Sequence, residues 1–174
     1  MPDVAGSAGL VLDTSVWINL LATNATEAIL GALAVPCHAP EQVVAEVKRH
    51  PVTGAVFTND DHPLRTMRGV SVLSLEGSEL DVFLDIVSAP AGDALGDGEA
   101  AAIAVAVSRG LDLAIDDRKA RRILRERFSH VLTYWTVDLL RARSVVAAAG
   151  RKRAEEYVAL AQRFGRMHAP RAQG

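Results

Sequence analysis

The sequence predicts an α/β fold in which helices sandwich a parallel sheet. Two observations support this class. Short apolar segments alternate with helical segments along the 174-residue chain, and the first and fourth apolar segments end in acids, at Asp13 and at Asp116–Asp117. Strands that alternate with helices build parallel sheets. Ligands bind such sheets beyond the carboxyl ends of the strands, so these acids mark the expected functional edge if the two strands are neighbours.

The expected elements follow in order from local patterns. Five short apolar or alternating segments predict strands at residues 9–13, 35–38, 70–75, 111–115 and near 130–133. Amphipathic or alanine-rich segments predict helices at 14–22, 24–34, 39–50, 78–89, 99–110, 117–127, 135–143 and 150–165. The segments 51–68 and 90–98, which contain Pro, Gly and Asp, should be irregular.

Residues typical of helix starts and ends support several of these predicted helices. Thr and Ser open the helix that follows Asp13, Pro40 lies near the first turn of the third helix, and Gly110 ends the alanine-rich helix. Helical spacing in 78–89 puts four apolar side chains on one face: Leu80, Phe83, Leu84 and Val87.

Length and composition predict a single domain over residues 1–174, with a core at about 9–143, a C-terminal helix at about 150–166 and a frayed tail at 169–174. Hydrophobic residues make up 49% of the chain. No apolar run is long enough for a membrane span and no secretory signal is visible, so we expect no membrane association and a cytoplasmic location. The single cysteine, Cys37, excludes an internal disulfide framework and a cysteine-based zinc site.

Charge is distributed unevenly along the chain. Residues 1–108 carry 4 Lys/Arg and 14 Asp/Glu, whereas residues 109–174 carry 15 Lys/Arg and 7 Asp/Glu. An acidic half joined to a basic half suits a protein that binds cations at one place and polyanions at another. Solvated helix faces and ion pairs between the halves are the alternative interpretation.

Six acids stand in apolar surroundings, which is unusual for carboxylates spread over a surface. They are Asp13, Glu46, Asp97, Glu99, Asp116 and Asp117. For most of these acids, a purely structural role is the alternative interpretation. Asp13, Asp97 and Asp117 could cap the helices that follow them, and Glu99 would favour a first helical turn. Glu46 could pair with Lys48 or Arg49.

The chemistry that needs such a cluster is divalent metal binding. Mg²⁺ and Mn²⁺ prefer oxygen ligands, keep several waters and use a few carboxylates. The five histidines are scattered without zinc spacing. A metal bound by carboxylates can activate water and stabilise the charge that develops on a phosphate, and it would explain the adjacent pair Asp116–Asp117.

Four segments together resemble the PIN-domain family, in particular the VapC-like toxin ribonucleases and their DUF3368-type relatives. They are "LVLDTSVWINL", "APEQVVAEV", "LGDGEAAAIAVAVSRG" and "LAIDDRKAR", in this order within residues 9–143. The resemblance implies a three-layer α/β/α sandwich with a parallel sheet of about five strands. It also implies an acidic pocket that binds Mg²⁺ or Mn²⁺.

Carried over residue by residue, the resemblance implies a catalytic set of Asp13, Glu46, Glu99 and Asp117. Asp97 and Asp116 are close alternates or additional metal ligands, and Thr14 and Ser15 are auxiliary hydroxyls. Two positions depart from the family pattern. Glu99 stands where Asp is common, and Ile115 stands where many members carry Thr or Ser.

The expected activity is Mg²⁺- or Mn²⁺-dependent endoribonuclease cleavage, as the toxin of a toxin–antitoxin pair. The RNA phosphates would be contacted by basic residues after the acidic pair: Arg118, Lys119, Arg121 and Arg122. The resemblance implies a homodimer and a cognate antitoxin as partners. A non-catalytic PIN-like module that binds RNA or protein is the alternative. A phospho-aspartate phosphatase is disfavoured, because Ser15 stands where that chemistry needs a second Asp.

Overall fold

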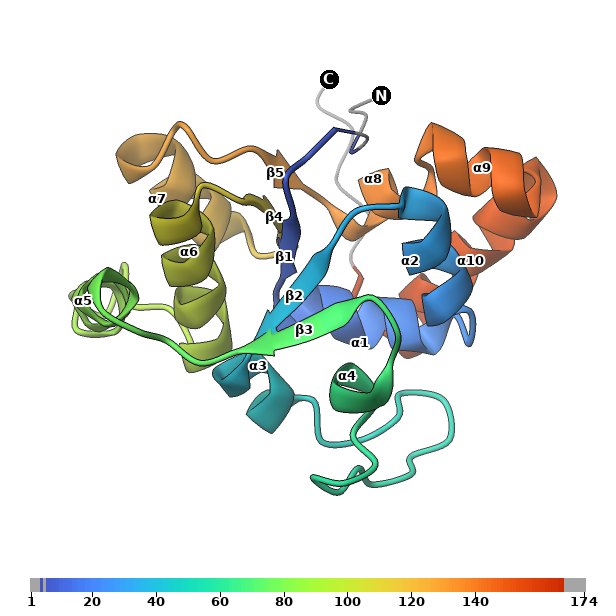
Figure 1. Cartoon of the computed structure of the whole chain (residues 1–174), viewed down its shortest axis with the longest axis horizontal. Helices are drawn as coiled ribbons and strands as arrows, with labels where there is room; N and C mark the ends of the chain where they lie inside the picture. Colours follow the sequence, from blue (N-terminus) through green and yellow to red (C-terminus); the bar gives the residue numbers. More distant parts are fainter. Residues whose placement is uncertain (1–3, 5, 168–174) are drawn as a thin grey trace.

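The computed structural model describes residues 4 and 6–167, and Figure 1 shows their arrangement. The expected tail at 169–174 lies outside the described residues. The strands are β1 (Leu10–Leu12), β2 (Cys37–Pro40), β3 (Val70–Leu73), β4 (Asp112–Ala114) and β5 (Thr133–Tyr134). The helices are α1 (Thr14–Ala22), α2 (Thr26–Leu33), α3 (Glu41–Glu46), α4 (Pro63–Thr66), α5 (Ser78–Val87), α6 (Asp97–Arg109), α7 (Arg118–Arg127), α8 (Thr136–Leu140), α9 (Arg143–Ala149) and α10 (Arg151–Phe164).

The sheet has five parallel strands in the order β3-β2-β1-β4-β5. The central strand β1 pairs directly with β4, with Leu10 opposite Asp112 and Leu12 opposite Ala114. The condition placed on the acidic edge, that the first and fourth strands are neighbours, is therefore met. Their carboxyl ends lie at the same edge, toward the bottom of Figure 1.

Helices cover both faces, so the predicted three-layer α/β/α sandwich is confirmed (Figure 1). Alternation along β1 divides the core into two clusters. Leu10 and Leu12 point toward the side of α1, α2 and α8–α10, whereas Val11 points toward α6 and α7. On the second side the alanines of α6 are fully buried, and this helix contacts β1, β2 and β4. Their small side chains let the helix lie close against the sheet.

Several boundaries differ from the sequence-based expectation. The third helix ends at Glu46 instead of residue 50, because the chain turns at Val47, whose carbonyl accepts a bond from the buried His62 ring at 2.7 Å. The expected irregular segment 51–68 contains α4. The expected strand near 130–133 lies at Thr133–Tyr134.

The apolar face expected for α5 is wrong in two of its four positions. Leu80 and Leu84 are 44% and 58% exposed, while Glu79 is buried. The Arg109 guanidinium pairs with Glu79 at 2.5 Å and holds the pKa of that carboxyl below its usual range. The ion pair allows Glu79 to occupy the side of α5 that faces α6.

Among residues 4 and 6–167, no single helix is both long and apolar enough to cross a bilayer. The α1–α2 pair reaches that length and hydropathy only when both helices are counted together, across a bend of 114°.

Candidate active site

Asp13 follows β1 at the point where the central strand passes into α1. Its buried carboxylate caps that helix by accepting the N–H of Val16 at 2.8 Å. Ser15 donates its hydroxyl to the same carboxylate, at 2.9 Å from Oδ1 and 2.8 Å from Oδ2. The capping role considered for Asp13 is therefore present, and the auxiliary Ser15 orients this acid.

Burial raises the pKa of Asp13 to about 8. The bonds from Val16 and Ser15 oppose this shift, while the charges of Asp116 and Glu99 add to it. The structure thus brings acids from β1, α6 and the end of β4 within electrostatic reach of one another. A cation among them would favour the ionised form of Asp13.

Glu46, the last residue of α3, reaches across to α1 and α6. Its Oε2 accepts the hydroxyl of Thr14, and its Oε1 accepts the backbone N–H of Gly98 at 2.9 Å. A Cβ atom at Gly98 would lie 2.9 Å from Glu46 Cδ and would overlap the Thr14 hydroxyl. The pairing of Glu46 with Lys48 or Arg49 is not seen among the described contacts. The auxiliary Thr14 instead positions this acid.

Glu99 lies in the first turn of α6 and is partly buried. Its Oε2 accepts the N–H of Gly96 at 3.2 Å. Burial raises the pKa of Glu99, and the charges of Asp117 and Glu46 add to the shift, while the Lys119 ammonium opposes it. Glu99 therefore lies within electrostatic range of both of these acids.

The adjacent acids Asp116 and Asp117 point to different partners. Asp116 accepts bonds from Asn19 Nδ2 at 2.7 Å, the Thr136 N–H at 2.8 Å and the Thr136 hydroxyl at 2.6 Å. Asp117 caps α7 by accepting the N–H of Ala120 at 2.7 Å. Each charge has its own donors, which explains how the chain accommodates the two acids side by side.

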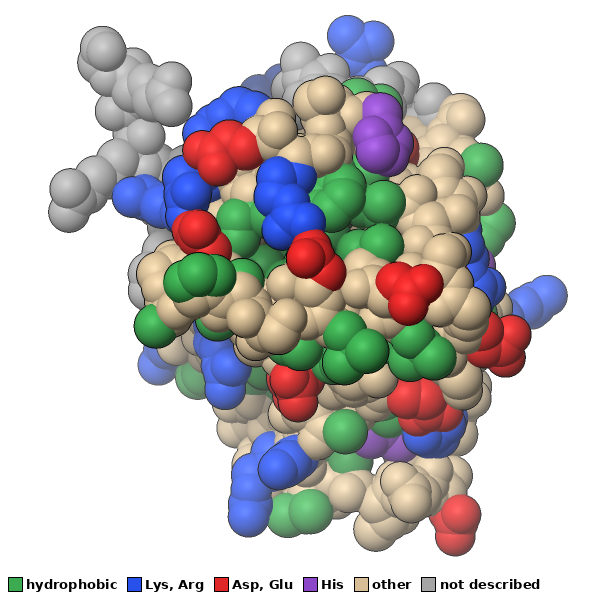
Figure 2. Space-filling view, turned by 90° about the vertical axis from the view of Figure 1, so that its left-hand side faces the viewer, with side chains coloured by type: hydrophobic (Ala, Val, Ile, Leu, Met, Phe, Trp, Pro, Cys, Tyr) green, Lys and Arg blue, Asp and Glu red, His purple; other side chains and the backbone are tan. Residues whose placement is uncertain are grey.

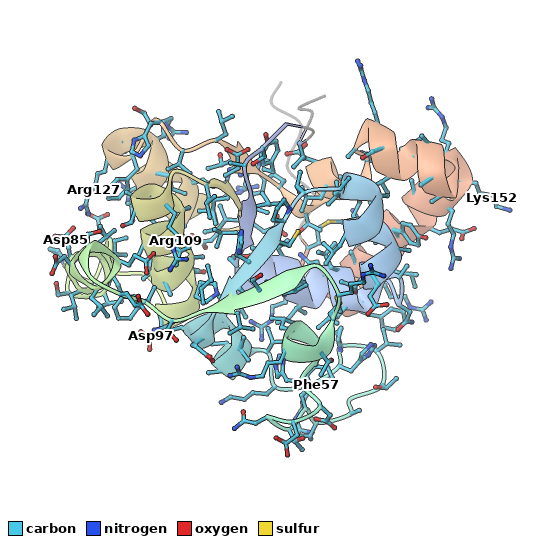
Figure 3. The ribbon with its side chains drawn as sticks, viewed as in Figure 1. Phe57, Asp85, Asp97, Arg109, Arg127 and Lys152 are labelled. Atoms are coloured by element: carbon cyan, nitrogen blue, oxygen red, sulfur yellow. The ribbon has the colours of Figure 1, made fainter. Side chains whose placement is uncertain are left out.

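Asp97 is separate from this cluster. It is exposed at the start of α6, where Gly96 takes the capping position, and its side chain has no hydrogen bond or ion pair among the described residues. Figure 3 labels it at the lower left, at the beginning of α6. The structure therefore brings together five of the six expected acids, namely Asp13, Glu46, Glu99, Asp116 and Asp117.

The basic residues of α7 have different surroundings. Arg118 is exposed and has no ion pair in the described structure, while Lys119 donates to the carbonyl of Ala94. Arg121 stacks on the Trp135 ring at 4.1 Å and bonds the carbonyls of Ile115 and Thr133. These contacts engage Arg121 within the fold.

Arg122, the fourth basic residue of the expected RNA contact, pairs with Asp93 and Glu126. Arg127 pairs in the same way with Asp85 between α7 and α5 (Figure 3). Figure 2 shows acidic and basic side chains interspersed on this face of the molecule. Ion pairs between the halves, the alternative interpretation of the uneven charge, therefore account for part of the basic helix.

The five clustered acids fit a hard divalent cation by donor chemistry. None of them forms a salt bridge within residues 4 and 6–167. In that part of the chain, no three His, Cys, Asp or Glu side chains are close enough to form a metal-binding group. The fit to a cation therefore rests on the chemistry of the oxygen donors, and an ion held there would keep part of its water shell.

Sequence reasoning missed three residues of this site. Gly98 donates to Glu46, while Asn19 and Thr136 donate to Asp116. The glycine between Asp97 and Glu99 was a signal for a close backbone approach. The only signal at Asn19 was that a polar residue interrupts a largely apolar helix, and its partner Asp116 lies 97 residues away.

Comparison with known protein families identifies the family of the chain. A family model described as a PIN domain, DUF3368, matches residues 9–133. The chain therefore belongs to the PIN-domain family, which generally includes nucleases and usually uses divalent metal ions. No curated protein and no solved structure gives a significant match.

Proposed function

We propose that this chain is a Mg²⁺- or Mn²⁺-dependent endoribonuclease and the toxin of a toxin–antitoxin pair. The observation that carries the proposal is the group of five acids that form no salt bridge with any described residue. One of them, Asp13, is fully buried, and burial raises its pKa to about 8. A nuclease that uses metal needs such a group, because carboxylates bind the cation and the cation meets the phosphate.

Asp13, Glu99 and Asp117 would bind the ion, with Asp116 adding negative charge beside Asp13. When bound, the ion supplies a polarised water as nucleophile and stabilises the charge that develops on the phosphate. Ser15 orients Asp13, and Thr14 with Gly98 orients Glu46, whose charge acts on Glu99. Hydrolysis adds water across one phosphodiester bond: phosphorus gains the water oxygen, and the leaving oxygen takes up a proton.

RNA is the proposed substrate because α7 begins immediately after Asp117. Arg118 is exposed there, and the Lys119 ammonium lies near Glu99. Both cations can contact phosphates that flank the bond to be cut. The proposal includes a homodimer, and an antitoxin that places a basic side chain against the acids. Light scattering of the purified chain tests the dimer.

The experiment that tests the function is Mn²⁺ and Mg²⁺ titration by calorimetry, followed by cleavage of a broad RNA pool. Wild type should bind the ion and cleave, while Asp13→Asn and Glu99→Gln should lose both. Asp97→Asn is the matched control, since Asp97 lies at the same helix start but outside the cluster.

Two results would contradict the proposal. One is a wild-type protein that neither binds the ions nor cleaves RNA. The other is RNA binding that persists in EDTA and in Asp13→Asn without cleavage, which would support a non-catalytic RNA-binding module.

A further inference from the structure

Asn19 connects three separate parts of the chain. It lies in α1 and is fully buried. Its Nδ2 donates to Asp116 Oδ2 at 2.7 Å and to the Thr136 hydroxyl at 3.2 Å, while its Oδ1 accepts the backbone N–H of Arg166 at 2.6 Å. One side chain thus joins the end of β4, the start of α8 and the chain that follows α10.

An amide is the side chain that these surroundings require. A carboxylate on one side needs a donor, and a backbone N–H on the other needs an acceptor. Asparagine supplies both from one planar group. Aspartate would set a second carboxylate against Asp116. An apolar residue would remove one donor of Asp116 and the acceptor of the Arg166 N–H.

The segment beyond α10 fits closely against this amide. A Cβ atom at Gly165 would overlap Asn19 Oδ1 and would lie 2.6 Å from the carbonyl of Ala161. The φ of Gly165 is −89°, so the requirement for glycine is steric. Gly165, Arg166 and Thr136 all lie beyond the family match, which ends at residue 133.

The contacts of Asn19 and Thr136 converge on the carboxylate of Asp116. The N–H of Asp13 donates to the carbonyl of Ala114 at 3.1 Å, which places Asp13 beside the end of β4, two residues before Asp116. The charge of Asp116 correspondingly raises the pKa of Asp13. Three hydrogen bonds from Asn19 and Thr136 fix the orientation of Asp116. The position of Asp116 beside Asp13 therefore depends on Asn19, which in turn contacts the chain after α10.

We propose that Asn19 is a positioning residue that couples the chain after α10 to the acidic site, so that the C-terminal helices support metal binding at Asp13 and its neighbours. The metal-binding part rests on the proposed function. The coupling between Arg166 and Asp116 is a property of the fold and is measurable without metal.

The first test measures Mn²⁺ affinity by calorimetry together with the melting temperature. Asn19→Asp and Thr136→Val should weaken binding by about 10- to 100-fold, the usual effect of removing a partner that orients a metal ligand. Thr136→Ser keeps the hydroxyl and should retain the wild-type affinity. Gly165→Ala should also weaken Mn²⁺ binding, because the added methyl group would displace Asn19, which holds Asp116.

Gly31→Ala is the control for Gly165→Ala, because a Cβ atom there meets nothing within 4 Å. Unchanged Mn²⁺ affinity in folded Asn19→Asp, Thr136→Val and Gly165→Ala, alongside wild-type binding, overturns the metal-binding part. So does a Thr136→Ser variant as weak as Thr136→Val, because the hydroxyl would then carry no effect.

The second test uses metal-free protein and trypsin. Asp116→Ala removes the closer of the two acceptors of Asn19 Nδ2, so cleavage after Arg166 should become faster, while cleavage after Lys152 on α10 (Figure 3) should not change. Asp97→Ala is the matched control. Equal cleavage after Arg166 in Asp116→Ala and wild type overturns the coupling. If wild type binds no Mn²⁺, the proposed function fails, and the trypsin result still decides the coupling.

Discussion

Gly98 and Glu46 determine each other's position in the acidic site. The N–H of Gly98 donates to Glu46 Oε1 at 2.9 Å, and a Cβ atom at Gly98 would lie 2.9 Å from Glu46 Cδ. Glycine at residue 98 thus lets α6 begin directly against the end of α3. This contact also sets the distance between Glu46 and Glu99, one residue further along.

We predict that Gly98→Ala destabilises the protein by about 1–3 kcal/mol, the usual cost of an added methyl group in a tightly packed region. Urea unfolding measures the loss. Gly31→Ala is the control: residue 31 is exposed in α2 and its new methyl group meets nothing, so alanine should stabilise the helix by about 0.5–1 kcal/mol. A Gly98→Ala variant as stable as wild type would refute this account of the contact.

The parallel sheet and the placement of acids at strand ends were predictable because both depend on short-range patterns, whereas the strand order was left open. Asp13 and Asp116 each follow an apolar segment, and the carboxyl ends of parallel strands meet at one edge. Whether these two acids meet depended on the adjacency of β1 and β4, which the sequence left open and the structure supplies.

The supporting contacts were not predictable because their partners are distant in sequence. Asn19 meets Asp116 across 97 residues, and Glu46 meets Gly98 across 52. Helical periodicity also mispredicted the buried face of α5. Arg109, 30 residues away, pairs with Glu79 and allows it to be buried, while Leu84 is exposed. Tertiary pairing outweighs local amphipathicity at such positions.

The ionisation of Asp13 predicts how stability depends on pH without metal. Its pKa is about 8 in the folded chain and near 4 when unfolded, so the folded state binds the proton more tightly. The stabilising effect is complete below about pH 4 and is lost as pH rises to about 8, at about 1.4 kcal/mol per pH unit. Asp13→Asn removes this dependence.

The measurement is urea unfolding in EDTA at several pH values between 5 and 8. The stability of Asp13→Asn relative to wild type should increase with pH, because other titrating groups contribute equally to both proteins. Parallel stability curves would show that Asp13 ionises normally. Adding Mn²⁺ should stabilise wild type but not the variant, since the cation favours the ionised carboxylate.

The stacking of Arg121 on Trp135 predicts a structural role for this arginine. Its guanidinium lies 4.1 Å from the ring centre and bonds the carbonyls of Ile115 and Thr133, at the ends of β4 and β5. Arg121→Ala should cost about 1–2 kcal/mol in thermal or urea unfolding. Arg125→Ala, an exposed position on the same helix, should change stability by less than about 0.5 kcal/mol. Equal stability of both variants would argue against the role.

The free and paired arginines of α7 should differ in RNA binding. Arg118 is exposed without an ion pair in the described structure, whereas Arg122 already pairs with Asp93 and Glu126. A cation that contacts a phosphate releases a counterion, so its removal lowers the salt dependence of binding. Arg118→Ala should therefore reduce the slope of log K against log salt by about 1, and Arg122→Ala should reduce it less.

Fluorescence titration of a labelled single-stranded RNA at four salt concentrations measures both slopes. Asp13→Asn is a suitable background, because it should prevent cleavage during the titration while leaving α7 unchanged. If Arg122→Ala lowers the slope as much as Arg118→Ala, RNA must displace Asp93 and Glu126 from Arg122 on binding. If neither variant changes the slope, the phosphates lie elsewhere on the surface, and the position of α7 beside the acids would not determine the path of the RNA.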